Sequence, residues 1–272
     1  MQKNILTWDT YKSWVSSLVA GNMSFYCRGH ADENWKLQTS FHRESARSGI
    51  TLLQYIDTIL PEVHYNISAV RDEIIDLRKE EEFGAFLALI QHHGFPTPLL
   101  DWTISPYVAA YFAFREVNDQ FPSSENVKIY IFDYIKWTKT FQQPLNLRDI
   151  SVKYVSVLRP YARYNKRIIA QQGSFTVTNV DDIESYLTDR SVESGLTFLY
   201  TAYISVKEKP HIMRELNLMG INEMTLFPSV GGICRSLKAQ FFSSETVGPT
   251  FKELMEVISK TKPETSVSPE EI

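Results

Sequence analysis

The longest unbroken run of apolar residues in this chain extends only from Tyr107 to Phe114. A helix that crosses a membrane needs about 20 such residues, so we expect no membrane span and no membrane partner. Ser105 and Pro106 stand immediately before the run. Serine is a favoured N-cap residue, and proline is favoured at the first helical position. The sequence therefore predicts a helix over Tyr107–Arg115.

The composition is typical of a globular protein. The 272 residues are 43% hydrophobic and 22% charged, which allows a sizeable core. No apolar leader follows Met1, so no secretory signal is expected. Cys27 and Cys234, the two cysteines, cannot form a disulfide framework or a four-cysteine zinc site. We expect a cytoplasmic protein without a bound metal.

The sequence patterns of several large enzyme classes are missing. The chain contains no GxGxxG, no GxxxxGK[ST], no GxSxG, no HExxH and no CxxC. These absences exclude a P-loop enzyme, a Rossmann dehydrogenase, a zincin and an ordinary α/β-hydrolase.

The order of the expected elements indicates an α+β fold. Residues 1–242 are predicted to form one domain, with helices inserted at about 43–90 between two strands. In that insertion Ile67, Val70, Ile74 and Leu77 are spaced as one helical face. Helix breaks are expected at Pro61 and Gly84. Residues 243–272 are expected to form a helix over Phe251–Ile258 and a flexible tail.

Hydrophobic patterns place the other elements. Helices are predicted over Trp8–Val19, Asp182–Leu187 and His211–Met219. Strands are predicted over Ser24–Gly29, Val127–Tyr134, Ile168–Ala170, Phe175–Thr178, Thr197–Ser205 and Met224–Phe227.

Arg28 is the first candidate functional residue, because it ends an otherwise aromatic strand and precedes Gly29. A fixed guanidinium followed by glycine suits the close approach of a phosphate or carboxylate. The alternative is a surface arginine beside a turn glycine.

A second candidate region extends from Gln91 to Ser105. Prolines rigidify its backbone, and rigid loops can hold polar side chains in place for a small molecule. The alternative is that its histidines are ordinary loop residues and its tryptophan belongs to the core. The polar residues concerned are Gln91, His92, His93, Thr97, Asp101, Trp102, Thr103 and Ser105.

Glu223 marks a third region, at the start of a short apolar segment that ends at Pro228. On the residues alone, a solvated carboxylate at the edge of a strand is the better explanation.

A fourth region combines basic and aromatic residues. The overall charge is 28 − 32 = −4, which argues against non-specific nucleic-acid binding. Between Arg148 and Arg167, however, cations alternate with tyrosines, as in surfaces that bind single-stranded nucleic acid. A solvated basic loop or a surface for an acidic inhibitor remains an alternative. The predicted acceptor-binding residues are Arg159, Tyr161, Arg163, Tyr164, Lys166 and Arg167.

The chain resembles the FRG-domain family. Its signature is an aromatic-Arg-Gly strand end followed by Q-H-x-G-x-P-T-x-L-L-D-W-T-x-x-P-x-x-A-x-x-F-A, which stands here from Gln91 to Ala113. Segments Ile168–Thr176 and Leu218–Gly232 are similar to later parts of the family, so the resemblance covers roughly residues 20–240. Cys27 occupies the position of the usual phenylalanine.

FRG-type sequences in turn resemble, more distantly, ADP-ribosyltransferases. This implies a mixed or antiparallel β core and an NAD site built from three elements. Arg28 and Gly29 are similar to the first element, Thr103 and Ser105 to the second, and Glu223 to the third.

The resemblance implies a role for each of these elements. Glu223 would stabilise the positive charge that develops on the ribose as nicotinamide leaves. Arg28 and Gly29 would bind the pyrophosphate, and Trp102 or Tyr111 would clamp the nicotinamide. His92 and His93 would contact the adenosine or deprotonate an acceptor. The predicted NAD-binding residues are Arg28, Gly29, His30, Gln91, His92, Asp101, Trp102, Thr103, Ser105 and Tyr111.

The function implied is an NAD-dependent ADP-ribosyltransferase toxin of anti-phage defence, with an antitoxin and a chaperone as partners. RNA, and mRNA in particular, is slightly favoured over protein as the acceptor, because Ile221 replaces the residue that commonly orients a protein acceptor. The alternatives are an NAD glycohydrolase, a protein ADP-ribosyltransferase, a non-catalytic NAD- or RNA-binding module, and a metal-free nuclease that uses His92 or His93.

Overall fold

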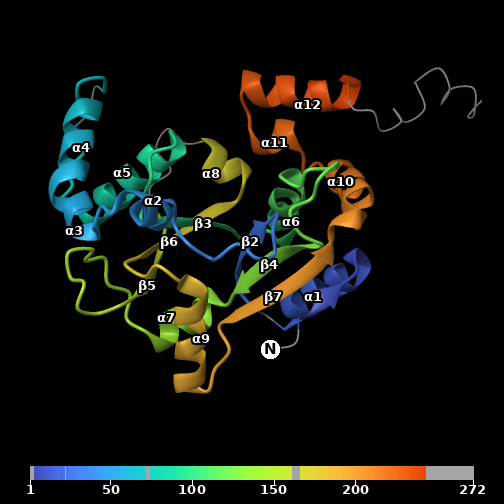
Figure 1. Cartoon of the computed structure of the whole chain (residues 1–272), viewed down its shortest axis with the longest axis horizontal. Helices are drawn as coiled ribbons and strands as arrows, with labels where there is room; N and C mark the ends of the chain where they lie inside the picture. Colours follow the sequence, from blue (N-terminus) through green and yellow to red (C-terminus); the bar gives the residue numbers. More distant parts are fainter. Residues whose placement is uncertain (1–2, 22, 72–73, 161–165, 243–272) are drawn as a thin grey trace, which may run out of the picture.

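The chain folds around a mixed, mostly antiparallel β-sheet (Figure 1). The computed structural model describes residues 3–21, 23–71, 74–160 and 166–242. Within these residues the sheet has seven strands in the order β1-β7-β4-β2-β3-β6-β5, and only the β1–β7 pair is parallel. The strands are β1 (Ile5–Leu6), β2 (Tyr26–His30), β3 (Leu99–Thr103), β4 (Asn126–Phe132), β5 (Val155–Leu158), β6 (Gly173–Thr178) and β7 (Leu199–Ser205). The expected mixture of helices with an antiparallel sheet is confirmed.

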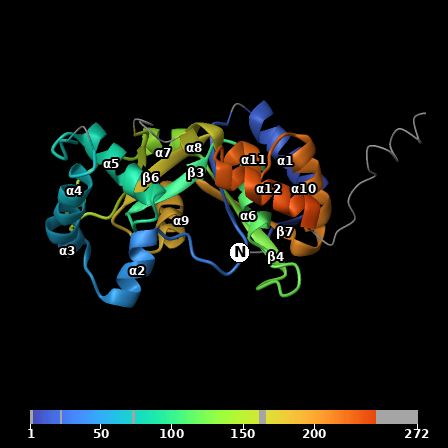
Figure 2. The same ribbon diagram turned by 90° about the horizontal axis from the view of Figure 1, so that it is seen from above.

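Helices lie on both faces and at both ends of this sheet (Figures 1 and 2). In both views, α3, α4 and α5 lie at one end, and α1 and α10 at the other. No helix in the described part of the chain is long and apolar enough to cross a bilayer. The helices are α1 (Trp8–Ala20), α2 (Ser40–Ser48), α3 (Leu52–Gln54), α4 (Leu60–Ser68), α5 (Glu80–His92), α6 (Pro106–Arg115), α7 (Tyr134–Thr140), α8 (Lys166–Ala170), α9 (Ile183–Ser194), α10 (Lys209–Leu218), α11 (Glu223–Leu226) and α12 (Val230–Phe242).

Strand β4 shows why both faces of the sheet are covered. Its residues are all buried, and successive side chains of a strand point to opposite faces. Ile129 and Ile131 belong to the core beneath α1, α6 and α10. Tyr130 and Phe132 belong to the core formed with α7 and α9. A strand that is apolar on both faces therefore sits at the centre of a three-layer arrangement.

Helix α6 packs unusually closely on β2, and Gly29 makes this contact possible. A Cβ atom at position 29 would lie 2.0 Å from the carbonyl oxygen of Ala109 and 2.8 Å from the Cβ of Ala113. No side chain fits at that distance, so Gly29 and the two alanines bring the helix backbone onto the strand. The start of α6 is as predicted, because the Ser105 side chain accepts a hydrogen bond from the Val108 amide.

The segment between β2 and β3 is helical, but not in the predicted pattern. Ile67 and Leu77 pack against the core, but Val70 and Ile74 are 84% and 78% exposed, so the four residues do not form one apolar face. Pro61 does not break the helix, since it lies in the first turn of α4 after a π-helical turn at Tyr55–Ile59. Gly84 does not break a helix either. It is buried within α5 and packs against Leu158 of β5.

Two predicted strands are wrong. Ile168–Ala170 lies in α8, and Met224–Phe227 overlaps α11. Such short apolar runs carry no periodicity that separates strand from helix. At α11 the local signal is a capping box, in which the Asn222 and Thr225 side chains bond each other's backbone amides.

The other predicted elements agree with the structure to within a few residues, except that α9 continues beyond Leu187 to Ser194. Strands β1 and β5 and helices α2, α7 and α12 were not predicted. The predicted helix at Phe251–Ile258 and the predicted tail lie outside the described residues.

Candidate functional site

The sheet opens at its centre, between β2 and β3. These two strands share a single residue pair, Cys27 with Thr103. Beyond that pair, Arg28–His30 pair only with β4, while the residues of β3 pair with β6. Because the two strands diverge, their facing backbone edges have no strand partner among the described residues. The split leaves an opening between β2 and β3 near the centre of the sheet.

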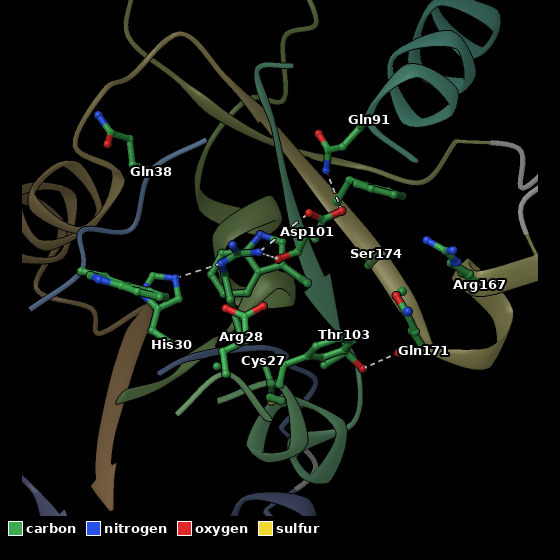
Figure 3. Close-up of a pocket in the computed structure, with 18 of the residues that line it drawn as sticks. Cys27, Arg28, His30, Gln38, Gln91, Asp101, Thr103, Arg167, Gln171 and Ser174 are labelled. Carbon is green, nitrogen blue, oxygen red and sulfur yellow. Dashed lines mark hydrogen bonds and ion pairs between the residues drawn. The ribbon is translucent and has the colours of Figure 1, made fainter. Parts of the chain in front are cut away.

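A cleft of about 960 Å³ occupies this split (Figure 3). Strands β2 and β3 form its floor, and α2, α5, α6 and α8 contribute to its walls. Its volume lies at the upper end of the range for small-molecule sites. The polar lining residues labelled in the figure are Arg28, His30, Gln38, Gln91, Asp101, Thr103, Arg167, Gln171 and Ser174.

Arg28 bridges the two strands where they separate. Its Nη1 donates a hydrogen bond of 2.7 Å to the backbone carbonyl of Asp101, and its Nε donates one of 3.1 Å to Nε2 of His30. Burial lowers the pKa of Arg28, but a guanidinium stays charged in proteins. Burial and the adjacent Arg28 charge lower the pKa of His30 to about 3. His30 is therefore a neutral acceptor that holds the guanidinium in place.

Asp101 is held by a chain of hydrogen bonds that begins in the core. The hydroxyl of buried Thr97 donates to Oε1 of Gln91. This contact leaves the amide nitrogen of Gln91 to donate to Oδ1 of Asp101, at 2.6 Å. The Asp101 side chain is 61% exposed and lies in the cleft beside Arg28 (Figure 3). Buried groups thus orient a carboxylate that solvent and ligands can reach.

The cleft carries a strong excess of positive charge. Among the residues that the structure describes, six cationic side chains line it, against two carboxylates, Asp101 and Glu116. The cations are Arg28, Lys36, Arg43, Arg47, Arg115 and Arg167. His92 also lines the cleft, and burial followed by the charge of Arg167 lowers its pKa, so it is neutral at pH 7. The lining has a formal charge of 6 − 2 = +4 in a protein of net charge −4. Such a site attracts an anion.

An aromatic ring surrounded by guanidinium groups forms one wall. The guanidinium carbons of Arg115, Arg167 and Arg235 lie 4.7, 5.5 and 5.7 Å from the ring centre of Phe227. Phe227 and Trp35 line the cleft, and Trp35 is 48% exposed. Sequence reasoning missed both aromatic residues. Neither lies in the motif block, and no local pattern signals that they meet at one cleft.

The structure does not bring Glu223 together with Arg28. Glu223 accepts hydrogen bonds from Tyr111 at 2.9 Å, from Arg115 at 2.8 and 3.1 Å, and from Arg235 at 2.6 Å. Burial opposes its ionisation, but these hydrogen bonds lower its pKa overall. Its side chain is 12% exposed and is not among the residues that line the cleft. In this arrangement Glu223 anchors α11 to α6.

Two predicted ligand-binding aromatic residues belong to the core instead. Trp102 borders the cleft, but it is 3% exposed and its ring nitrogen donates to Oγ1 of Thr176, at 2.9 Å. Tyr111 is buried among apolar residues of the α6 side and does not line the cleft.

The remaining residues of the predicted NAD site fall into two groups. Gly29 and Thr103 line the cleft, and the Thr103 hydroxyl donates to the carbonyl of Gln171, at 2.8 Å. Ser105 caps α6, and His93 lines a separate surface pocket with Phe95.

The predicted acceptor surface divides between two places. Arg159 donates to the hydroxyl groups of Tyr26 and Tyr134, at 3.1 and 2.9 Å, whereas Arg167 lies in the cleft. Tyr161, Arg163 and Tyr164 lie outside the described residues, and the side chain of Lys166 is likewise not described.

Part of the chain that contains the centre of this site is similar to a known domain family. Residues 23–121 match the family model described as the FRG domain. This confirms the expected resemblance over that stretch, which contains β2, β3, α6 and the residues Arg28, Gln91 and Asp101. No curated protein and no solved structure matches the chain.

Proposed function

We propose that the cleft binds NAD and that the protein transfers ADP-ribose from NAD to a macromolecule, with RNA favoured as the acceptor. The observation that carries the proposal is the charge of the cleft, +4 from six cations and two carboxylates, at a break in the sheet. A pyrophosphate carries two negative charges, and arginine is the side chain best suited to bind it. The volume of about 960 Å³ is large enough for a dinucleotide together with part of an acceptor.

The groups needed for the chemistry are present in the cleft. Cleavage of the nicotinamide–ribose bond passes through an oxocarbenium-like state, which a nearby carboxylate stabilises. Arg28 is preorganised by His30 and by the Asp101 carbonyl, so little entropy is lost when it binds a phosphate. Phe227 offers an aromatic face for a base or for the nicotinamide ring.

The rim of the cleft favours RNA as the acceptor. Lys36, Arg43 and Arg47 line the cleft, and so does Trp35, which is about half exposed. Cations together with an exposed aromatic ring are typical of surfaces that bind single-stranded nucleic acid. A role in anti-phage defence, with an antitoxin that covers this basic cleft and a chaperone, follows from the family resemblance and is part of the same proposal.

The proposal is tested by incubating the protein with nicotinamide-labelled and adenylate-labelled NAD, and with RNA or cell lysate. We expect nicotinamide release, together with transfer of adenylate label to RNA. Arg28→Gln should lower the release at least about tenfold, since a charge-assisted hydrogen bond contributes about 1.5–3 kcal/mol. Arg148→Gln is the matched control, because Arg148 pairs with Asp57 at 2.9 Å and does not line the cleft.

Each of the other outcomes identifies an alternative. Free ADP-ribose without labelled RNA or protein would indicate a glycohydrolase, and labelled protein alone would indicate a protein ADP-ribosyltransferase. NAD binding without nicotinamide release would indicate a non-catalytic module. RNA cleavage without NAD would indicate a nuclease. All four contradict the proposed transfer to RNA.

A further inference from the structure

We infer that Asp101 supplies the carboxylate that acts at the ribose of NAD, an inference that rests on the function proposed above. The first reason is position. Among the described residues that line the cleft, only Asp101 and Glu116 carry carboxylates. The Glu223 carboxylate is instead held by Tyr111, Arg115 and Arg235.

The second reason is that the hydrogen bonds to Asp101 can form in only one direction. A carboxylate only accepts hydrogen bonds, so Oδ1 of Asp101 requires the NH₂ group of Gln91 as its donor. Oε1 of Gln91 then faces Thr97, whose hydroxyl donates to it, while Oγ1 of Thr97 accepts a hydrogen bond of 3.3 Å from the Leu99 amide. Thr97 is 0% exposed, so water does not compete for the hydrogen bond between Thr97 and Gln91. The core of the protein thus sets the orientation of Oδ1.

The third reason is the state of the other carboxylate oxygen. Oδ2 of Asp101 lies 3.9 Å from Nη1 of Arg28, close enough for attraction but too far for a hydrogen bond. Arg28 uses Nη1 to bond the Asp101 backbone carbonyl instead, at 2.7 Å. No side chain in the described part of the protein donates a hydrogen bond to Oδ2. One oxygen is therefore anchored, while the other is available to a substrate.

The Glu116 carboxylate is not anchored by hydrogen bonds in this way. It follows the last residue of α6, its side chain is 56% exposed, and its ion pair with Arg115 is 3.9 Å long. No hydrogen bond from a described side chain holds it. A flexible carboxylate would lose conformational entropy on reaching the reaction centre, whereas Asp101 is already ordered.

The transfer exchanges one bond at ribose C1′ for another. The bond between ribose C1′ and the nicotinamide nitrogen breaks, and its electron pair leaves with neutral nicotinamide. The acceptor oxygen forms a bond to C1′, and its proton passes to the Asp101 carboxylate and then to water. Before that transfer, the same carboxylate stabilises the positive charge on the oxocarbenium-like ribose.

The main test is Asp101→Asn in the full-length protein, with nicotinamide release and NAD binding measured separately. We expect the rate of release to fall at least about 100-fold, as when one charge-stabilising group is removed elsewhere. NAD affinity measured by calorimetry should stay within about threefold or improve, because a negative charge near the phosphates is lost. Asp57→Asn is the matched control, because Asp57 pairs with Arg148 at 2.9 Å and does not line the cleft; it should retain the wild-type rate within about threefold.

Thr97→Val tests the hydrogen-bond chain without changing any charge. It removes the donor to Gln91, and we expect kcat to fall about tenfold while KM for NAD stays constant. Thr97→Ser keeps the hydroxyl and should restore kcat. A fall in stability alone, or equal loss in the Val and Ser variants, would contradict the positioning role of Thr97.

The failure of this inference can be told apart from failure of the proposed function. An active wild type with an active Asp101→Asn variant overturns only the assignment of Asp101. A wild type that releases no nicotinamide with RNA, protein or water overturns both. Loss of NAD binding in Asp101→Asn would make Asp101 a binding residue and would also overturn the assignment. If Asp101→Asn does not fold, the comparison of kcat in Thr97→Val and Thr97→Ser tests the assignment of Asp101 instead.

Discussion

At the scale of single residues, Arg28 and Gly29 show how two neighbours in one strand take opposite roles. Arg28 reaches across the split in the sheet to the backbone of β3. Gly29 faces the other way, onto the carbonyl of Ala109 in α6. The pattern of arginine followed by glycine predicted an anion contact at both positions. The close packing of α6 on β2 requires glycine at position 29 whether or not a ligand binds.

The lowered pKa values of two buried histidines predict how the stability of the fold depends on pH. Burial lowers the pKa of His42 to about 4, against about 6.5 in an unfolded chain. Below pH 6.5 the unfolded chain binds a proton that the folded state excludes, so stability is lost as the pH falls toward 4. For His42 this loss is about 2 kcal/mol between pH 7 and pH 5. His30, with a pKa of about 3, contributes in the same direction.

Urea unfolding at the two pH values measures this effect. In His42→Gln the fall in unfolding free energy from pH 7 to pH 5 should be smaller than in the wild type by about 2 kcal/mol. His211→Gln, a change at a side chain that is 64% exposed, serves as the control. An unchanged pH dependence in His42→Gln would show that His42 titrates alike in the folded and unfolded states.

At the scale of elements, a few specific contacts of α11 and α12 hold Phe227, the residue after α11, at the cleft. Glu223 ties α11 to Arg115 of α6, and Gln171 donates to the carbonyl of Leu226, at 3.1 Å. Gly232 of α12 lies against α11, since a Cβ atom there would be 1.9 Å from the carbonyl oxygen of Phe227. The position of Phe227 in the cleft therefore depends on this helix pair.

Gly232→Ala and Gly231→Ala form a matched pair for this contact. The first should displace α12 and destabilise the protein by about 1–3 kcal/mol, because the clash is with backbone. The second meets the end of the Arg235 side chain at 3.4 Å and the Ser229 hydroxyl at 3.9 Å, and should be neutral or slightly stabilising in a helix. Thermal unfolding and hydrogen exchange of α11 measure the difference. Equal behaviour of the two variants would contradict the described packing.

The elements also show where prediction from sequence succeeds. Helix α6 was predicted because its N-cap, its proline and its apolar run are contiguous in the chain. Helix α11 was predicted as a strand because four residues are too few to show the hydrophobic period that separates a helix from a strand. Val70 and Ile74 were assigned to an apolar helical face but are exposed, because apolar spacing alone does not show whether another element covers such a face.

At the scale of the whole molecule, positive charge is concentrated in one place. The chain has a net charge of −4, yet the cleft lining has a formal charge of +4. A polyanion is repelled by the rest of the surface and attracted to the cleft, so electrostatic attraction directs it to the cleft rather than to other parts of the surface.

This charge distribution predicts a strong salt dependence of RNA binding. If the cleft neutralises four phosphates of a single strand, log affinity should fall with log salt with a slope of about −2.8. Raising KCl from 50 to 200 mM would then weaken binding about 50-fold. Fluorescence anisotropy with a labelled oligouridine measures the slope. In the Arg43→Gln, Arg47→Gln double variant it should be shallower by about 1.4. A slope near zero in the wild type would exclude binding through the cleft.

The sequence by itself determined the elements whose signals are local and the residue types of the site. It pointed to Arg28, Gln91 and Asp101 because they stand in short, dense motifs. Only the tertiary structure decided which of these groups meet. Arg28 and Asp101 are 73 positions apart, and Glu223 meets Tyr111 across 112 positions. Whether a carboxylate faces a cleft or is neutralised by arginines depends on strand pairing and helix docking, and no local pattern encodes the partners that long-range packing supplies.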